Sequence, residues 1–182
     1  VKEGEMVGVF AQNMPEWSIA DFGILSVRGV SVPIYATNTA KQAEYIVNDA
    51  EIRVLFVGDK AQYEKITSFI DSSKYLKKII VFDGNVQLKG NHSVSFKDFL
   101  EVGKKSAKDS IVADRTSRGS VDDIATLIYT SGTTGDPKGA ILTHGNFAHQ
   151  CRAIDERFSV GVGDRSLCFL PLSDAYERTW SY

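Results

Sequence analysis

The densest cluster of potential phosphate-binding groups in the sequence lies between residues 129 and 139. The run reads Tyr-Thr-Ser-Gly-Thr-Thr-Gly-Asp-Pro-Lys-Gly, with three glycines, four serine or threonine side chains and one lysine, Lys138. Glycine lets a backbone approach a ligand closely, and exposed backbone N–H groups in such a turn form a concave anion site. The hydroxyl groups and the lysine supply further donors. The chemistry predicted for this stretch is binding of the oligophosphate of a nucleotide.

Apolar residues border this run on both sides, at 124–128 and at 140–142. Both segments are typical of strands, so the run is predicted to be a loop that joins two strands. The pattern of P-loop NTPases does not fit, because Lys138 precedes Gly139, no Ser or Thr follows the lysine, and a strand follows the loop. A surface loop without function is the remaining alternative. A hydroxyl-rich and glycine-rich run that ends in Pro-Lys-Gly is atypical of such a loop.

The same run resembles the signature loop of the adenylate-forming superfamily, which includes acyl-CoA synthetases, luciferases and peptide-synthetase adenylation domains. Residues 170–178, Leu-Pro-Leu-Ser-Asp-Ala-Tyr-Glu-Arg, resemble the next motif of the long-chain fatty-acid–CoA ligase branch. The resemblance extends over nearly the whole chain and implies an N-terminal fragment of such a ligase. Ligases of this branch activate a fatty acid with ATP to an acyl-adenylate and then form a thioester with coenzyme A.

The resemblance also implies roles for individual residues. ATP would be contacted through its triphosphate by Thr130, Ser131, Gly132, Thr133, Thr134, Gly135 and Lys138. In adenylation, negative charge builds up on the departing pyrophosphate, so Lys138 is a catalytic candidate that would neutralise it. A plain surface lysine is the alternative. Thr130 is implied as a Mg²⁺ ligand, which makes ATP and Mg²⁺ the expected cofactors and coenzyme A the co-substrate.

Asp174 is the second catalytic candidate, at a position where this chain departs from its relatives. Long-chain ligases usually have histidine there, close to the reacting carboxylate and phosphate, and an ionised aspartate would face two anions. Like charges about 4 Å apart repel by roughly 4 kcal/mol at an effective dielectric constant near 20. Three alternatives follow: Asp174 turns away or pairs with a cation such as Arg178, its pKa is raised so that it is neutral, or the protein adenylates poorly. The first is favoured, because pairing is the commonest way to keep such a carboxylate.

Two alternatives remain open for neighbouring residues and for the function. Glu177 and Arg178 either adjoin the acyl and nucleotide pockets or form a structural ion pair. In function, the runners-up are an adenylation domain or acyl-AMP ligase with another acceptor, and a catalytically silent nucleotide-binding module. Fatty-acid-dependent pyrophosphate exchange would separate an enzyme from a silent module.

Composition limits the partners and the compartment. The 182 residues carry a formal net charge of −2 and show no basic stripe, which argues against a nucleic-acid partner. Cys151 and Cys168 lie in apolar patterns and are predicted to be buried thiols, as in a reducing cytosol. No apolar run approaches the ~18 residues of a membrane span. The expected location is cytoplasmic, and membrane association and a homodimer are left open for the full protein. The chain starts at Val1 and ends at Tyr182 without a cap, so we expect a piece of a longer protein.

Periodicity predicts strands that alternate with helices. The expected strands lie at 7–10, 31–35, 53–57, 78–82, 124–128, 140–142 and 166–170, and the expected helix caps are Asn13, Thr39, Asp59, Ser95 and Thr143. This alternation is typical of an α/β fold with a mostly parallel sheet and helices on both faces. The predicted division is a βαβ-type subdomain at 1–105, a polar linker at 106–123 and the start of a second subdomain at 124–182.

Overall fold

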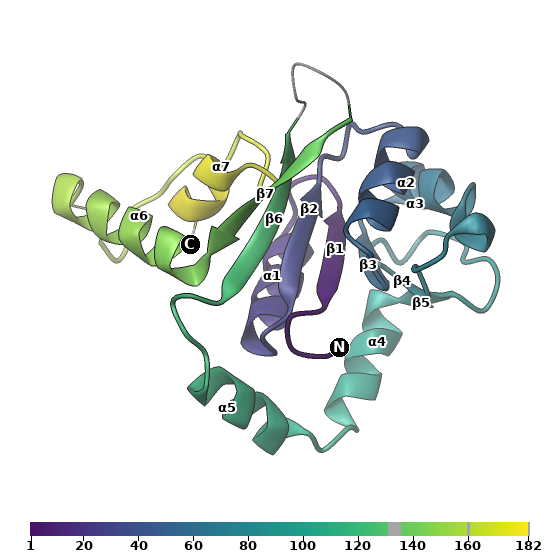
Figure 1. The fold of residues 1–182 in the computed structure, drawn as a ribbon, viewed down its shortest axis with the longest axis horizontal. Coiled ribbons are helices and arrows are strands. Elements are labelled where there is room, and N and C mark those ends of the chain that lie inside the picture. The colour runs from purple at the N-terminus through teal and green to yellow at the C-terminus, as the bar shows by residue number, and fades with distance from the viewer. Residues whose placement is uncertain (131–135, 160, 182) are drawn as a thin grey trace.

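A sheet of seven strands organises the chain in the computed structural model, which describes residues 1–130, 136–159 and 161–181 (Figure 1). In chain order the strands are β1 (Met6–Phe10), β2 (Val30–Ile34), β3 (Val54–Val57), β4 (Lys78–Val81), β5 (Ser93–Ser95), β6 (Ile124–Thr130) and β7 (Lys138–Thr143). They lie side by side in the order β5-β4-β3-β1-β2-β6-β7. Strands β1 to β6 pair with one another in parallel, and β7 is antiparallel to β6. The predicted mostly parallel α/β sheet is confirmed.

Helices cover both faces of this sheet, as predicted. They are α1 (Pro15–Ser26), α2 (Ala40–Asp49), α3 (Lys60–Thr67), the short 3-10 helix η1 (Ile70–Ser72), α4 (Phe96–Lys104), α5 (Asp109–Ser117), α6 (His144–Arg157) and α7 (Ala175–Trp180). One core cluster joins the sheet to apolar side chains of α2 and α3, and a second cluster joins it to α1 and α4. Beyond β6 and β7, α6 and α7 lie at one side of the sheet (Figure 1).

Local capping explains where most helices begin. Capping boxes join Thr39 to Gln42 at α2 and Asp59 to Gln62 at α3, and each pair satisfies backbone N–H groups that the helix leaves free. Thr143 caps α6 in the same way. The predicted caps of α2, α3, α4 and α6 are therefore confirmed. The predicted cap at Asn13 is wrong, since α1 begins after Met14 without a side-chain cap.

Two further sequence-based expectations, a strand at 166–170 and two buried cysteine thiols, also fail. The predicted strand at 166–170 does not form, and the side chains of Leu167 and Phe169 are 78% and 73% exposed. An apolar alternation becomes a strand only where a neighbouring strand completes its hydrogen bonds, and no described strand pairs here. Cys168 is exposed and Cys151 is half-buried, so the prediction of two buried thiols is wrong.

Four elements were not predicted: β5, η1, α5 and α7. Strand β5 has only three residues, two of them serines, and α5 buries none of its side chains. Helix α5 lies within segment 106–123, and strand β6 after it pairs in parallel with β2. Residues 124–143 thus add two strands to the sheet formed by residues 6–95. The division into two subdomains stays a prediction.

Candidate functional site

The two ends of the candidate phosphate loop meet as a cross-strand pair. In the antiparallel ladder of β6 and β7, Thr130 lies directly opposite Lys138. Side chains in such a pair lie on the same face with Cβ atoms roughly 4.5–5.5 Å apart, and both of these residues are exposed. The structure thus brings together the first and last of the predicted triphosphate-binding residues. Those between them (Ser131, Gly132, Thr133, Thr134 and Gly135) lie outside the described residues, and their role stays a prediction.

The next pair down the hairpin fixes its position against α2. Tyr129 lies opposite Gly139, and its hydroxyl group donates a 2.6 Å hydrogen bond to Oδ2 of Asp49, the last residue of α2. Burial, and then this carboxylate, raise the pKa of Tyr129 far above that of a free tyrosine. A Cβ atom added to Gly139 would lie 3.2 Å from Cζ of the Tyr129 ring. The glycine of Pro-Lys-Gly therefore allows the ring to pack beside the base of the loop.

Asp174 lies at the carboxyl end of β2, where it caps α7. Its Oδ1 accepts a 2.8 Å hydrogen bond from the backbone N–H of Tyr176, and its Oδ2 accepts a 3.3 Å bond from the hydroxyl group of Tyr35, the residue after β2. Burial, and then the nearby Asp174 carboxylate, raise the pKa of Tyr35. The carboxylate is thus occupied by a helix cap and a hydroxyl donor. Within the favoured alternative, that Asp174 turns away or pairs with a cation, the example of Arg178 as the cation is wrong, because the guanidinium of Arg178 forms an ion pair with Asp21.

Glu177 and Arg178 are both buried but have separate partners. Glu177 accepts hydrogen bonds from the backbone N–H of Leu170 and the hydroxyl group of Ser181, whereas Arg178 binds Asp21 of α1. The alternative of an ion pair between the two neighbours is therefore excluded, and a position next to the acyl and nucleotide pockets stays a prediction. Sequence reasoning also missed Asp21, although its position in the apolar stripe of α1 was a readable sign that a partner must lie in the core.

Asn13 is a second residue whose role was missed. Its side-chain amide donates a 2.7 Å hydrogen bond to the carbonyl oxygen of Leu170, and its Oδ1 accepts a 2.8 Å bond from the backbone N–H of Leu172. Nδ2 also lies 3.3 Å from Sγ of Cys168. One asparagine after β1 thus holds the segment that leads into Asp174 and α7.

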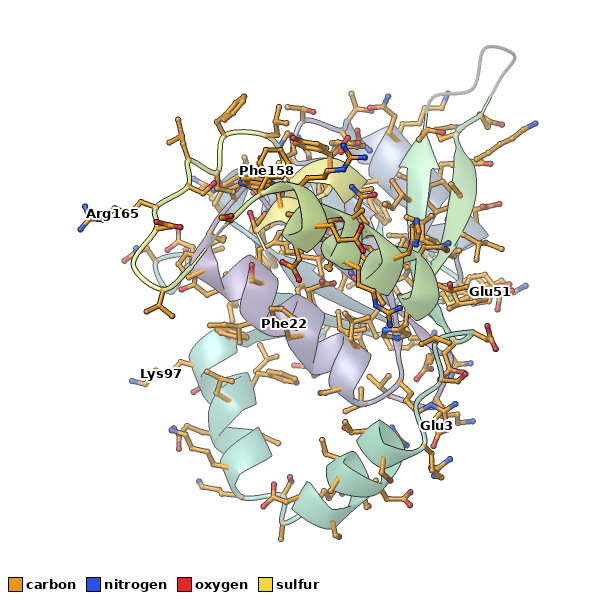
Figure 2. All side chains as sticks on the ribbon, turned by 90° about the vertical axis from the view of Figure 1, so that its left-hand side faces the viewer. Glu3, Phe22, Glu51, Lys97, Phe158 and Arg165 are labelled. Carbon is orange, nitrogen blue, oxygen red and sulfur yellow. The ribbon has the colours of Figure 1, made fainter. Side chains whose placement is uncertain are left out.

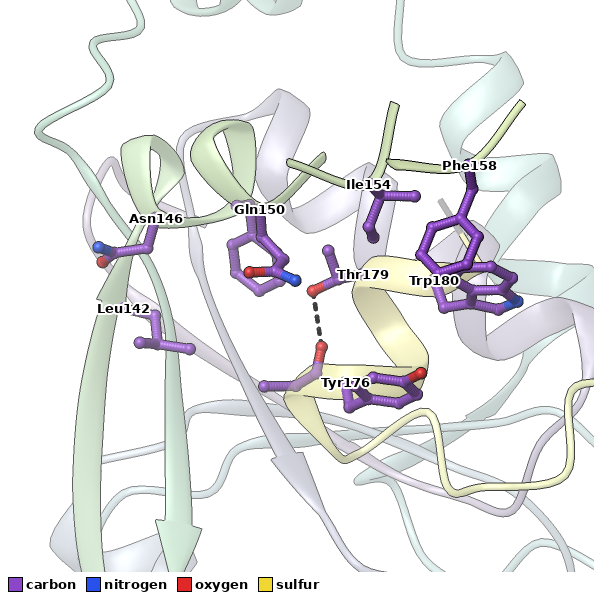
Figure 3. A pocket seen from close by; sticks show the side chains of 10 residues that line it. Leu142, Asn146, Gln150, Ile154, Phe158, Tyr176, Thr179 and Trp180 are labelled. Atoms are coloured by element: carbon purple, nitrogen blue, oxygen red, sulfur yellow. Dashed lines mark hydrogen bonds between the residues drawn. The ribbon is translucent and has the colours of Figure 1, made fainter. Parts of the chain in front are cut away.

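An apolar cavity of about 410 Å³ lies between α6 and α7 (Figure 3). It is lined by Leu142, Asn146, Phe147, Gln150, Ile154, Phe158, Ala175, Tyr176, Thr179 and Trp180. The rings of Phe158 and Trp180 meet edge to face with centroids 5.6 Å apart, and Nε1 of Trp180 donates to the hydroxyl group of Ser166. Mostly apolar side chains with only a few polar groups at their side suit a hydrocarbon ligand.

The described residues hold no cluster of three or more His, Cys, Asp or Glu side chains that would bind a metal ion. Mg²⁺ keeps oxygen ligands and is commonly bound by one protein oxygen together with the phosphates of a substrate. The exposed hydroxyl group of Thr130, opposite a lysine at the loop, is chemically compatible with this mode. Thr130 as a Mg²⁺ ligand stays a prediction. In the described part of the chain, no helix has the length and apolar character needed to cross a bilayer.

Comparison with known proteins places this geometry in a family. The family model of AMP-binding enzymes matches residues 1–182. The long-chain-fatty-acid–CoA ligase ACSBG2 of Xenopus laevis is 33% identical over 171 residues, which cover 92% of this chain and 23% of that protein. The long-chain-fatty-acid–CoA ligase FadD15 of Mycobacterium tuberculosis is 33% identical over 183 residues, which cover 100% and 29%. The chain therefore spans only about a quarter of the length of these relatives.

Solved structures agree with this assignment. The anthranilate CoA ligase AuaEII, crystallised with anthranoyl-AMP, superposes with a TM-score of 0.67 at 26% identity, over 84% of this chain and 27% of that one. A long-chain-fatty-acid–CoA ligase of Archaeoglobus fulgidus has the same fold, with a TM-score of 0.73 at 23% identity over 99% of this chain and 33% of that one. The glycine- and hydroxyl-rich hairpin, the capped α7 and the match over every residue lead to one conclusion: the chain belongs to the family of AMP-binding enzymes.

Proposed function

We propose that the protein carrying this chain is an acid–thiol ligase that activates a fatty acid with ATP and transfers the acyl group to coenzyme A. The observation that carries this proposal is the geometry of β7. Lys138 and Leu142 are four residues apart on this strand, so their side chains point to the same face about 13 Å apart. Leu142 lines the apolar cavity, and Lys138 lies at the end of the phosphate loop. The apolar cavity and the end of the candidate phosphate loop thus share one face of one strand.

The residues present fit the groups that the reaction needs. When bound, ATP supplies the α-phosphate to which the fatty acid carboxylate becomes linked, with pyrophosphate as the leaving group. Thr130, Lys138 and the loop between them would hold the triphosphate, and the ammonium group of Lys138 would neutralise charge that grows on the leaving group. The Thr130 hydroxyl group would contribute one oxygen ligand to Mg²⁺. The cavity between α6 and α7 would hold the acyl chain away from water.

Replacing Lys138 by alanine in the full protein tests this proposal. Fatty-acid-dependent exchange of pyrophosphate into ATP should occur in the wild-type protein. In Lys138→Ala the kcat of this exchange reaction should fall by roughly ten- to a thousandfold, which corresponds to an increase of about 1.4–4 kcal/mol in the activation free energy. Transfer of the acyl group from preformed acyl-adenylate to coenzyme A should change far less, because the pyrophosphate has already left.

Lys97→Ala is the matched control, since this lysine projects into solvent from α4 (Figure 2). Its two half-reactions should match those of the wild-type protein. Equal losses in both half-reactions of Lys138→Ala would assign the lysine a structural role. No exchange with fatty acids of any chain length in the full wild-type protein would contradict the proposed function.

A further inference from the structure

Arg178 connects more elements of the fold than any local rule would predict. Its side chain is fully buried, and Nε and Nη2 donate to the two carboxylate oxygens of Asp21 at 2.8 and 2.7 Å. Nη1 donates at 2.9 Å to the hydroxyl oxygen of Thr126 in β6. The guanidinium carbon also lies 5.7 Å from the ring centroid of Trp17 and 5.1 Å from that of Phe147. From α7, one side chain therefore contacts α1, β6 and α6.

The contact with β6 extends to β2. The hydroxyl group of Thr126, which accepts from Arg178, donates its own hydrogen to the carbonyl oxygen of Ser31 at 2.7 Å. Thr126 belongs to the strand that ends at Thr130, the first residue of the candidate phosphate site. The guanidinium is thus joined by hydrogen bonds to the strand that carries the loop and to its parallel neighbour.

A gain in the free energy of folding does not explain why Arg178 and Asp21 form a buried ion pair. Both charges lose their hydration on burial, so well-packed apolar residues of similar volume are often as stable as a buried ion pair. The bidentate geometry fixes both the distance and the angle between the two side chains, which an apolar contact does not do. What the Arg178–Asp21 pair provides is therefore a defined orientation of α7 against α1.

Helix α7 needs this anchor. It has six residues, too few for a helix that is stable by itself. Asp174, the N-cap of α7, is bound to Tyr35 at the carboxyl end of β2. The α7 side chains Tyr176, Thr179 and Trp180 form a wall of the apolar cavity (Figure 3). A small rotation of α7 would move that wall and the Asp174 carboxylate together.

We propose that Arg178 and Asp21 are a positioning pair that holds the α7 wall of the cavity in register with the strand leading to the phosphate loop. The proposal rests on the proposed function, since it assigns the pair to placement of the fatty acid carboxylate. Because its side chain is fully buried, Arg178 would act through α7 and not by direct contact with the fatty acid, ATP or coenzyme A.

The test separates stability from position with two variants in the full protein. Arg178→Met leaves Asp21 as a buried charge without this guanidinium. Asp21→Ala/Arg178→Met removes both charges, and the flexible methionine side chain fills part of the space that the alanine leaves. The matched control is Arg118→Met, which removes a half-exposed arginine that binds Glu3 and Asp114 away from α7.

Three measurements are compared: unfolding in urea, hydrogen exchange of the backbone amides of residues 174–180, and the steady-state constants of adenylation. Arg178→Met should raise the unfolding equilibrium constant by roughly 10²- to 10³-fold, and the double variant should recover most of that loss. In the double variant the α7 amides should still exchange about tenfold faster or more. Its kcat/KM for the fatty acid should fall by roughly ten- to a hundredfold, with the KM for ATP within about twofold.

A double variant with wild-type exchange in α7 and wild-type kcat/KM for the fatty acid would overturn the inference, because the pair would then be structural only. The double variant keeps this test decisive even if Arg178→Met fails to fold. If the wild-type protein shows no acid-dependent pyrophosphate exchange, the proposed function fails, and hydrogen exchange in α7 still decides whether the pair positions this helix.

Discussion

Three substitutions of Asp174 separate its structural contribution from its charge. An asparagine side chain can accept the capping hydrogen bond through its carbonyl oxygen and donate from its amide group to the hydroxyl oxygen of Tyr35, so Asp174→Asn should change the free energy of unfolding by less than about 0.5 kcal/mol. Asp174→Ala removes the cap of α7, worth about 1 kcal/mol, and leaves the hydroxyl group of Tyr35 without this acceptor, worth up to another ~1 kcal/mol. The alanine variant should thus lose about 1–2 kcal/mol of stability. Asp174→His, which introduces the residue that the resemblance implies for long-chain ligases, should fall between the two.

The three Asp174 variants should rank differently in adenylation activity than in stability. A free carboxylate about 4 Å from a bound substrate anion would raise the energy of that anion by roughly 4 kcal/mol at an effective dielectric constant near 20. Because the Asp174 carboxylate is held by the α7 cap and by Tyr35, we expect most of this repulsion to be avoided. Asp174→Asn and Asp174→His should therefore leave the rate of pyrophosphate exchange unchanged or increase it.

Urea unfolding and fatty-acid-dependent pyrophosphate exchange, measured on the same preparations of the full protein, check both orders. An Asp174→Asn protein that unfolds like the wild type but exchanges pyrophosphate more than about tenfold more slowly (~1.4 kcal/mol) would refute this reasoning. That result would mean that the negative charge has a positive role in the reaction.

Two further predictions concern the stem of the hairpin. The pKa of Tyr129 is higher in the folded state than in the unfolded state, where tyrosines ionise near ~10. The free energy of unfolding should therefore be unaffected by this group below pH ~10 and should fall as the pH rises above that value. Urea unfolding from pH 8 to 11 should show a shallower fall for Tyr129→Phe, and an unchanged slope would exclude this tyrosine as a source. Gly139→Ala should lose about 1 kcal/mol, because the new Cβ atom would lie 3.2 Å from the Tyr129 ring, whose hydroxyl group is held by Asp49. Gly84→Ala, where the new atom meets nothing within 4 Å, is the control, and equal stabilities of the two variants would contradict the packing argument.

The sequence predicts those parts of the fold whose causes are local. The capping boxes of α2, α3 and α6 each depend on two residues three positions apart, and the apolar stripes repeat within one helix. Strand β5 and helix α5 escaped prediction because neither has an apolar pattern of its own. The segment 166–170 has such a pattern and still forms no strand, which shows that a pattern is insufficient without a pairing partner.

The same distinction applies to the candidate site. Thr130 and Lys138 belong to one continuous sequence motif, and the resemblance of that motif to a family signature implied that both contact the triphosphate. Arg178 was expected to pair with Asp174, one helical turn away, but its partner Asp21 is 157 residues away in the sequence. Asn13 likewise binds Leu170 across 157 residues. Contacts of this range depend on how the whole sheet is assembled, and no short-range rule contains that information.

The position of β6 in the sheet has a consequence for how the chain is made. Ser31 and Thr126 are joined by a hydrogen bond although 95 residues separate them, and β2 is buried along its whole length. At about 5–20 residues per second, a ribosome needs roughly 5–20 s to make the intervening segment. During that interval one edge of an apolar strand lacks the neighbour that covers it in the finished sheet. Unpaired apolar edges are sites of aggregation, so a nascent chain of this protein is most in need of a chaperone between the synthesis of β2 and that of the hairpin.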